Sequence, residues 1–226
     1  MNEQRTRVLL VDDHCMFLEA LRLALQSVGQ FDVVGVATNT DEGLMLANER
    51  EPDIVICDIQ LPGAGGFCLA EELHTQRPET RFAILTGFCS DALLESALRV
   101  HVRGYLLKTD PIGELVTAIL AIARGEMHFS SSIRHRLMCD AEGKWRVRSA
   151  TLLSSLSTQQ VEVLRHLARG LSVKEVARLM KVTAKAIDSQ KYRLMKLLGI
   201  HDRVVLAHFA VEHGLISPDQ EQRLAS

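Results

Sequence analysis

Residues 52–58 read Pro-Asp-Ile-Val-Ile-Cys-Asp, a short apolar run that ends in the carboxylate of Asp58. Three more apolar runs end in polar residues: 8–11 before Asp12 and Asp13, 82–85 before Thr86, and 105–107 before Lys108. Such runs are typical of strands in a buried parallel sheet, where ligands bind outside the carboxyl ends of the strands. The runs therefore predict three carboxylates, a hydroxyl and an ammonium group at one sheet edge, which is the outline of a phosphoryl-transfer site.

The first half of the chain alternates between strand and helix patterns. We expect strands over 8–11, 31–37, 54–58, 82–86 and 104–107, followed in turn by a helix that ends at Gly29 and by helices 41–50, 67–76, 91–101 and 111–124. Such alternation predicts an α/β fold: a doubly wound, five-stranded parallel sheet with right-handed crossovers and helices on both faces.

The second half shows only helical patterns. Helices are expected over 157–169, 172–180, 184–198 and 201–213, which together make a small all-α domain. Residues between the halves lose the strand–helix rhythm and are interpreted as a linker with one helical turn near 133–138. The expected organisation is a first domain over 1–125, a linker over 126–152 and a second domain over 153–226.

The composition fits a globular protein, with 226 residues of which 47% are hydrophobic and 24% charged. The net charge of −2 is unevenly distributed, because residues 1–124 carry 10 Lys and Arg against 18 Asp and Glu, whereas residues 125–226 carry 16 against 10. An acidic half joined to a basic half indicates two modules, the second of which meets a polyanion.

Cysteine usage and hydropathy bear on location. The five cysteines are odd in number and lack Cys-x-x-Cys spacing, so we expect reduced thiols in a cytoplasm. We find no signal peptide, and no apolar stretch approaches the ~20 residues that cross a bilayer. No membrane association is therefore expected.

Clustered carboxylates at a strand edge repel one another, and a hard divalent cation with oxygen ligands relieves that repulsion. Mg²⁺ is the natural candidate. A carboxylate held against the metal can act as a nucleophile toward phosphorus, while a lysine and a hydroxyl stabilise the transferring oxygens. Asp58 is best placed to be that nucleophile and to form an aspartyl phosphate.

Residues 6–125 resemble the receiver domain of two-component response regulators. The matching segments are Leu-Leu-Val-Asp-Asp at 9–13, Pro-Asp-Ile-Val-Ile-Cys-Asp at 52–58, Leu-Pro-Gly at 61–63, Thr-Gly at 86–87 and Gly-Tyr-Leu-Leu-Lys at 104–108. The resemblance implies that Asp58 accepts phosphate from a histidine kinase. It further implies a Mg²⁺ site made by Asp13, Asp58 and the backbone carbonyl of Gln60, with Asp12 acting through water.

The same resemblance implies roles for the neighbours of the phosphoryl group. Lys108 would contact it, and Gly87 would leave room beside it. Thr86 would swing toward the phosphate and Tyr105 would follow inward, so that phosphorylation would change the face around helix 91–101 and strand 104–107.

Helices 172–180 and 184–198 are joined by Lys181-Val182-Thr183, which gives the proportions of a helix-turn-helix. If Ile187, Leu194 and Leu198 face the core, the opposite side of the second helix presents Lys185, Asp188, Ser189, Tyr192 and Lys196. Lysines suit phosphates or guanine and hydroxyls suit base edges, so this helix is predicted to enter the major groove of double-stranded DNA.

Residues 153–216 resemble the LuxR-type helix-turn-helix. The matching segments include Leu156-Ser157-Thr158, Glu162-Val163-Leu164, Ala168-Arg169-Gly170-Leu171-Ser172, Lys174-Glu175-Val176-Ala177 and Lys196-Leu197-Leu198-Gly199-Ile200. Together with the receiver, they make the chain similar to NarL/FixJ-type response regulators. That family uses the last helix for self-association, which here implies a homodimer through Val204, Val205, His208 and Val211.

We expect a transcriptional regulator rather than an enzyme, in which phosphorylation of Asp58 controls binding to promoter DNA. Two alternatives stay open. The chain could bind DNA without phosphorylation and use the receiver as a dimerisation platform. It could also act mainly as an aspartyl-phosphate enzyme whose second module binds protein.

Overall fold

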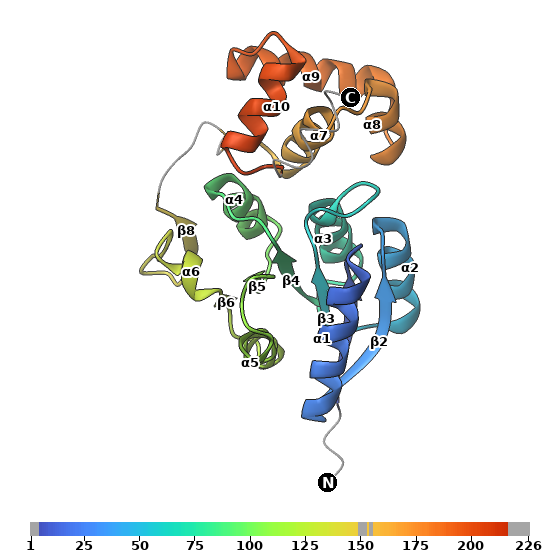
Figure 1. Ribbon diagram of the computed structural model, residues 1–226, viewed down its shortest axis with the longest axis vertical. Coiled ribbons are helices and arrows are strands. Elements are labelled where there is room, and N and C mark those ends of the chain that lie inside the picture. Colours follow the sequence, from blue (N-terminus) through green and yellow to red (C-terminus); the bar gives the residue numbers. More distant parts are fainter. Residues whose placement is uncertain (1–4, 149–152, 154–155, 217–226) are drawn as a thin grey trace. The chain divides into compact units, whose positions relative to one another are not determined.

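The computed structural model describes residues 5–148, 153 and 156–216 (Figure 1). Residues 149–152 of the predicted linker and 217–226 of the predicted second domain lie outside the described residues. The chain divides into two compact units, one formed by 1–87 with 97–135 and the other by 88–96 with 136–226.

The first unit is built on a parallel sheet with the strand order β2-β1-β3-β4-β5-β6. Its first five strands match the predicted ones: β1 (Thr6–Val11), β2 (Phe31–Ala37), β3 (Ile54–Cys57), β4 (Arg81–Thr86) and β5 (Gly104–Leu107). The helices of this unit are α1 (Cys15–Val28), α2 (Thr40–Arg50), α3 (Gly66–Gln76) and α5 (Ile112–Ala123). Between β4 and β5 the chain forms α4 (Asp91–Arg99), whose residues 91–96 are grouped with the second unit. The α/β alternation read from the sequence is confirmed.

The sheet is covered on both faces, as a doubly wound fold requires. On one face, alternate strand residues such as Val8, Leu10 and Ile56 form a core with α1 and α5. On the other face, α2 and α3 lie so close to β1 that a Cβ on Gly43 would be 3.1 Å from side-chain carbons of both Leu69 and Val11.

Local signals explain most helix ends. Gly29 adopts a left-handed conformation with φ 75°, which ends α1 without the steric cost that a side chain would bring. The side chain of Asn39 accepts a hydrogen bond from Glu42 N and starts α2. The predicted helix 91–101 ends earlier, at Arg99, because the chain turns through a left-handed His101 with φ 57°.

The expected five-stranded sheet requires one correction, because a sixth strand from the predicted linker extends it. Strand β6 (His128–Phe129) pairs in parallel with β5. It leads into α6 (Ser131–Arg134), and the antiparallel hairpin of β7 (Leu137–Cys139) and β8 (Trp145–Val147) follows. These strands of two or three residues are too short to show a periodic pattern in the sequence.

The second unit contains the four predicted helices: α7 (Thr158–Ala168), α8 (Val173–Leu179), α9 (Ala184–Leu198) and α10 (Arg203–Glu212). Capping boxes start α7 and α8, where Ser157 pairs with Gln160 and Ser172 with Glu175. Gly199 ends α9 with φ 66°. Within the described residues, none of the helices is both long and apolar enough to cross a membrane.

Candidate functional site

The strand registers bring the predicted polar residues to one edge of the sheet. Val11 lies beside Cys57, and Thr86 lies beside Leu107, so the residues that follow these strands converge. The backbone N–H of Asp58 donates to Val11 O over 2.9 Å, and that of Lys108 donates to Thr86 O over 2.9 Å. Asp58 is thus the first residue after β3, and its backbone is held by the neighbouring strand.

Lys108 joins the two buried carboxylates of this edge. Its Nζ lies 2.7 Å from Asp12 Oδ2 and 2.8 Å from Asp58 Oδ2. Each aspartate is only 2% exposed, so bulk water hydrates and screens neither carboxylate effectively. The structure therefore brings together the predicted acceptor, one predicted metal-site residue and the predicted phosphate contact.

The ammonium group of Lys108 stays charged in this setting. Burial lowers its pKa, but attraction by Asp58 and hydrogen bonds to Asp12 and Asp58 outweigh burial and leave the pKa raised above its ordinary value. The Nζ also lies 5.7 Å from the ring centroid of Phe17, which adds a cation–π contact.

Asp13 and His14 complete the exposed side of the cluster. His14 Nδ1 lies 3.0 Å from Asp12 Oδ1 and 3.0 Å from Asp13 Oδ1. Potential ligand atoms of Asp12, Asp13, His14 and Asp58 all lie within 4.8 Å of one another. The sequence interpretation missed His14, although its position directly after the two aspartates could have indicated it.

This donor set fits the predicted Mg²⁺ ion. Its three carboxylates supply the hard oxygen ligands that Mg²⁺ prefers. Asp58 Oδ1 is buried and has no hydrogen-bond partner among the described residues. A buried carboxylate oxygen in that condition is costly unless something else, such as a cation, interacts with it.

Gly66 allows the chain to pass close to Asp58, a requirement that the sequence interpretation missed. A Cβ at Gly66 would overlap the backbone carbonyl oxygen of Asp58. The N–H of Gly66 donates to Ile59 O over 3.1 Å. Only a glycine therefore fits at the start of α3 without moving the backbone at Asp58.

The predicted switch residues lie near the same edge. Thr86 and Tyr105 are both fully buried, at the end of β4 and within β5. Gly87 has open space around it, since a Cβ there would meet nothing within 4 Å.

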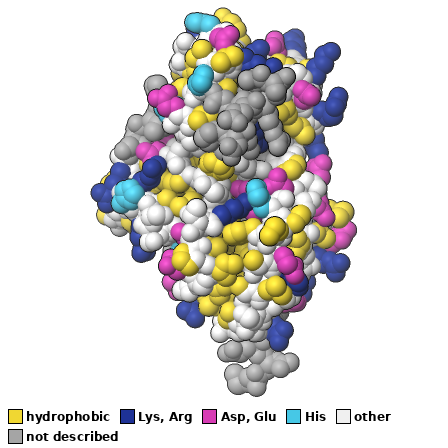
Figure 2. Space-filling view, in the orientation of Figure 1, with side chains coloured by type: hydrophobic (Ala, Val, Ile, Leu, Met, Phe, Trp, Pro, Cys, Tyr) yellow, Lys and Arg dark blue, Asp and Glu magenta, His cyan; other side chains and the backbone are white. Residues whose placement is uncertain are grey.

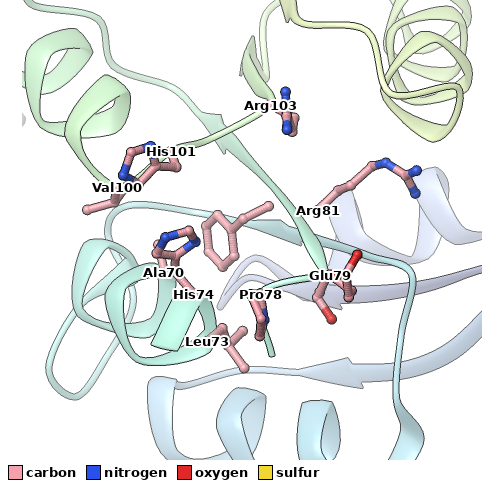
Figure 3. Close-up of a pocket in the computed structure, with 11 residues that line it drawn as sticks. Ala70, Leu73, His74, Pro78, Glu79, Arg81, Val100, His101 and Arg103 are labelled. Atoms are coloured by element: carbon pink, nitrogen blue, oxygen red, sulfur yellow. The ribbon is translucent and has the colours of Figure 1, made fainter. Parts of the chain in front are cut away.

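A separate hollow of about 180 Å³ lies at the amino ends of β4 and β5, away from the acidic edge (Figure 3). Its rim includes His74 and His101, whose rings stack with centroids 4.7 Å apart. Ligand pockets usually measure about 300–1,000 Å³, so this hollow is small for a bound molecule. It contributes nothing to the acidic edge.

Helix α9 has one buried and one exposed side. Ile187 and Leu194 are buried, and Leu198 is half-buried. All five residues predicted to face DNA are exposed: Lys185, Asp188, Ser189, Tyr192 and Lys196. Arg193 is also exposed and was missed, although it lies one helical turn beyond Ser189.

The adjoining surface is basic. Exposed cations on α8 and α9 are Lys174, Arg178, Lys185, Arg193 and Lys196. Figure 2 shows Lys and Arg side chains over the part of the surface that carries these two helices. Such a cluster can neutralise phosphate groups of a nucleic acid.

Comparison with known proteins defines the class of both parts. Residues 8–120 match the family model of the response regulator receiver domain, and residues 154–210 match the model of bacterial regulatory proteins of the luxR family. The chain therefore belongs to the two-component response regulators that carry a LuxR-type DNA-binding domain.

Individual relatives align with this chain over almost its whole length. A putative transcriptional regulator of Pseudomonas aeruginosa is 30% identical, over 93% of this chain and 100% of the relative. The response regulator UvrY of Escherichia coli is 26% identical, over 94% of this chain and 96% of UvrY. A structure of the response regulator RcsB from Salmonella typhimurium superposes with a TM-score of 0.72 at 25% identity, over 93% of this chain and 99% of RcsB.

Proposed function

We propose that this chain is a phosphorylation-controlled transcriptional regulator whose Asp58 accepts phosphate from a histidine kinase. The observation that carries the proposal is the environment of the Asp58 carboxylate. One oxygen pairs with Lys108 at 2.8 Å, while the other is buried and has no hydrogen-bond partner among the described residues. This arrangement leaves one oxygen available to form a bond to phosphorus.

Mg²⁺ would be held by Asp13, Asp58 and the backbone carbonyl of Gln60, with Asp12 acting through water. When bound, the ion supplies positive charge that offsets the negative charge of the carboxylates and of the transferring phosphoryl group. The proximity of Asp12, Asp13 and Asp58 supports this assignment.

Phosphoryl transfer would form a bond between an Asp58 carboxylate oxygen and phosphorus and break the bond from phosphorus to the kinase histidine. The Lys108 ammonium, which now pairs with Asp58, would contact the new phosphoryl oxygens. The hydroxyl of Thr86 would donate a hydrogen bond to the phosphoryl oxygens, beside the open space at Gly87. Tyr105 would move inward with Thr86, so that its position would depend on the phosphorylation of Asp58.

The second domain would bind double-stranded promoter DNA through α9. Lys185 and Lys196 would contact phosphates or guanine, and Asp188, Ser189 and Tyr192 would contact base edges or the backbone. The relative RcsB interacts with DNA, which supports this role. Val204 and Val205 of α10 are 64% and 51% exposed, which favours self-association into a homodimer.

We place this regulator in the cytoplasm, where promoter DNA is found. The receiver would cover 1–125 and the DNA-binding domain 153–226, with β6 of the intervening 126–152 adding to the receiver sheet. The chain would act as a regulator rather than as an enzyme.

The test measures phosphate uptake from a small phosphodonor with Mg²⁺ in the wild type, Asp58→Asn and Asp32→Asn. Asp32 is an exposed residue of β2 and serves as the matched control. We expect uptake by the wild type and Asp32→Asn but not by Asp58→Asn. Uptake by Asp58→Asn would contradict the assignment of the acceptor.

DNA affinity with and without beryllofluoride tests the control by phosphate. A higher affinity in its presence is expected. Equal affinities would favour the alternative, a regulator that binds DNA independently of phosphorylation and uses the receiver to dimerise.

A further inference from the structure

Strand β6 attaches the segment that leaves the receiver directly to the strand that precedes Lys108 (Figure 1). The N–H of His128 donates to Arg103 O over 2.9 Å, and the N–H of Ser130 donates to Tyr105 O over 3.0 Å. In the same register, Phe129 lies beside Tyr105. The backbone beyond α5 is therefore paired along β5.

Ser130 makes this attachment specific to the Lys108 end of the strand. Its Oγ accepts a hydrogen bond from the N–H of Leu107 over 2.9 Å, and the hydroxyl donates to a carboxylate oxygen of Asp110. These two partners flank Lys108 in the chain. Ser130 is only 3% exposed, so water competes little for the hydroxyl.

The residue that pairs with Asp58 is thus connected to the outgoing segment by a short path. Lys108 Nζ contacts Asp58, the residue before Lys108 donates to Ser130, and Ser130 is followed directly by α6. A shift of the backbone at Lys108 must either carry Ser130 along or break its hydrogen bonds to Leu107 and Asp110.

We infer that Ser130 is the positioning residue through which a change at Lys108 reaches residues 131–148, the described segment that leads toward the second domain. The inference rests on the proposed function, since it concerns the consequence of phosphorylating Asp58. Coupling requires a group that interacts differently in the two states of the receiver. The Ser130 hydroxyl is such a group if the Lys108 end of β5 moves.

The experiment compares the full-length wild type, Ser130→Ala, Ser130→Thr and Ser132→Ala. Ser132 is an exposed residue of α6, so its replacement makes the same chemical change outside the path. Phosphate uptake and DNA affinity, with and without beryllofluoride and Mg²⁺, are measured for each chain.

We expect Ser130→Ala to take up phosphate as the wild type does but to lose most of its gain in DNA affinity. The ratio of affinities with and without beryllofluoride should fall by about tenfold, within the usual range of coupling between sites. Ser132→Ala should keep the ratio, and Ser130→Thr, which retains a hydroxyl, should restore at least part of it. A ratio in Ser130→Ala equal to that of the wild type would overturn the inference.

Amide hydrogen exchange in the wild type decides the matter even if Ser130→Ala folds poorly. Beryllofluoride should change the exchange of the Leu107 and Ser130 amides and leave that of Val55, in the core of β3, unchanged. If beryllofluoride changes the DNA affinity but leaves the exchange of the Leu107 and Ser130 amides unchanged, this inference is wrong and the proposed function still stands. A wild type that takes up no phosphate would overturn the proposed function and the inference with it.

Discussion

The ammonium group of Lys108 lies between two buried carboxylates, so it competes with any metal ion for their negative charge. Replacing Lys108 with Met removes a charge 2.7–2.8 Å from Asp12 and Asp58. We expect Lys108→Met to bind Mg²⁺ roughly tenfold more tightly, because the positive charge of Lys108 repels the ion. At such short range, the energy of a charge interaction exceeds about 1 kcal/mol even near a protein surface. Calorimetric titration measures the effect, with the exposed Lys174→Met as control. Unchanged or weaker binding would contradict this view of Lys108.

Gly66 and Gly113 both lie in helices, yet they should respond in opposite ways to alanine. A Cβ at Gly66 overlaps the Asp58 carbonyl oxygen, whereas one at Gly113 meets nothing within 4 Å. Gly66→Ala should therefore cost about 1–3 kcal/mol of unfolding free energy, as overpacking does. Gly113→Ala should add about 0.5–1 kcal/mol, because alanine favours helix. Urea unfolding measures both, and equal effects would contradict the close approach at Gly66.

At the scale of elements, α7 contains a buried ion pair. Arg165 Nη1 lies 3.1 Å from both carboxylate oxygens of Glu162, and Arg165 Nε donates to Leu215 O over 2.9 Å. Both side chains are fully buried. Arg165 thus connects α7 to Leu215, shortly after α10, and its burial keeps bulk water from the ion pair.

Glu162→Gln should therefore destabilise the second domain by about 3 kcal/mol, because it removes the negative charge that lies 3.1 Å from a buried guanidinium. The matched control is Glu19→Gln, which breaks a pair with Arg22 at the same i,i+3 spacing on the surface of α1. Glu19 is exposed and Arg22 is half-buried, so solvent weakens the pair and we expect no measurable change. Denaturant unfolding of the two variants provides the test, and equal effects would count against the buried pair.

Strand β6 should weaken in acid through His128. Burial lowers the pKa of His128, and Arg134 lowers it further, while Asp110 and Glu126 oppose them less strongly. Since the folded pKa lies below the ordinary value of 6.5, the unfolded chain binds more protons, and stability falls as the pH drops below about 6.5. His128→Gln should flatten this fall in unfolding experiments between neutral and mildly acid pH. An unchanged profile would contradict the role of His128.

The sequence predicts the long elements well, because they carry periodic apolar patterns and recognisable ends. Asn39, Ser157 and Ser172 cap their helices, and Gly29 and Gly199 end theirs, all through local chemistry. The strands β6, β7 and β8 could not be predicted this way. They exist because of their partner strands, and two or three residues show no period.

The residues of the candidate site also fall into two groups, those that could be predicted from the sequence and those that could not. Asp12, Asp58 and Lys108 could be predicted because parallel strands end at a common edge, which places their following residues together. Gly66 and Ser130 could not, since their importance depends on distances between segments that are remote in the chain. A glycine that opens a helix and a serine in a polar stretch look ordinary in the sequence alone.

At the scale of the whole molecule, charge separates the two functions. In the proposed function, the acidic part would bind a cation and a phosphoryl group, whereas the basic part would bind the polyanion DNA. The affinity of the full chain for DNA should therefore fall steeply with salt, with a log–log slope of about −0.9 for each phosphate contacted. Lys196→Ala should make the slope shallower by about one contact. A chain that binds no DNA would instead support a protein-binding second module and the enzyme alternative.

Strand β6 has one more consequence, which concerns the outer border of the sheet. It covers the backbone groups of Arg103, Tyr105 and Leu107 that would otherwise face solvent. An uncovered strand of this kind is a template on which neighbouring molecules can add their own strands and aggregate. A chain cut at residue 125 would have such an open border. We therefore expect a chain that keeps residues 128–130 on β5 to aggregate less than the cut chain.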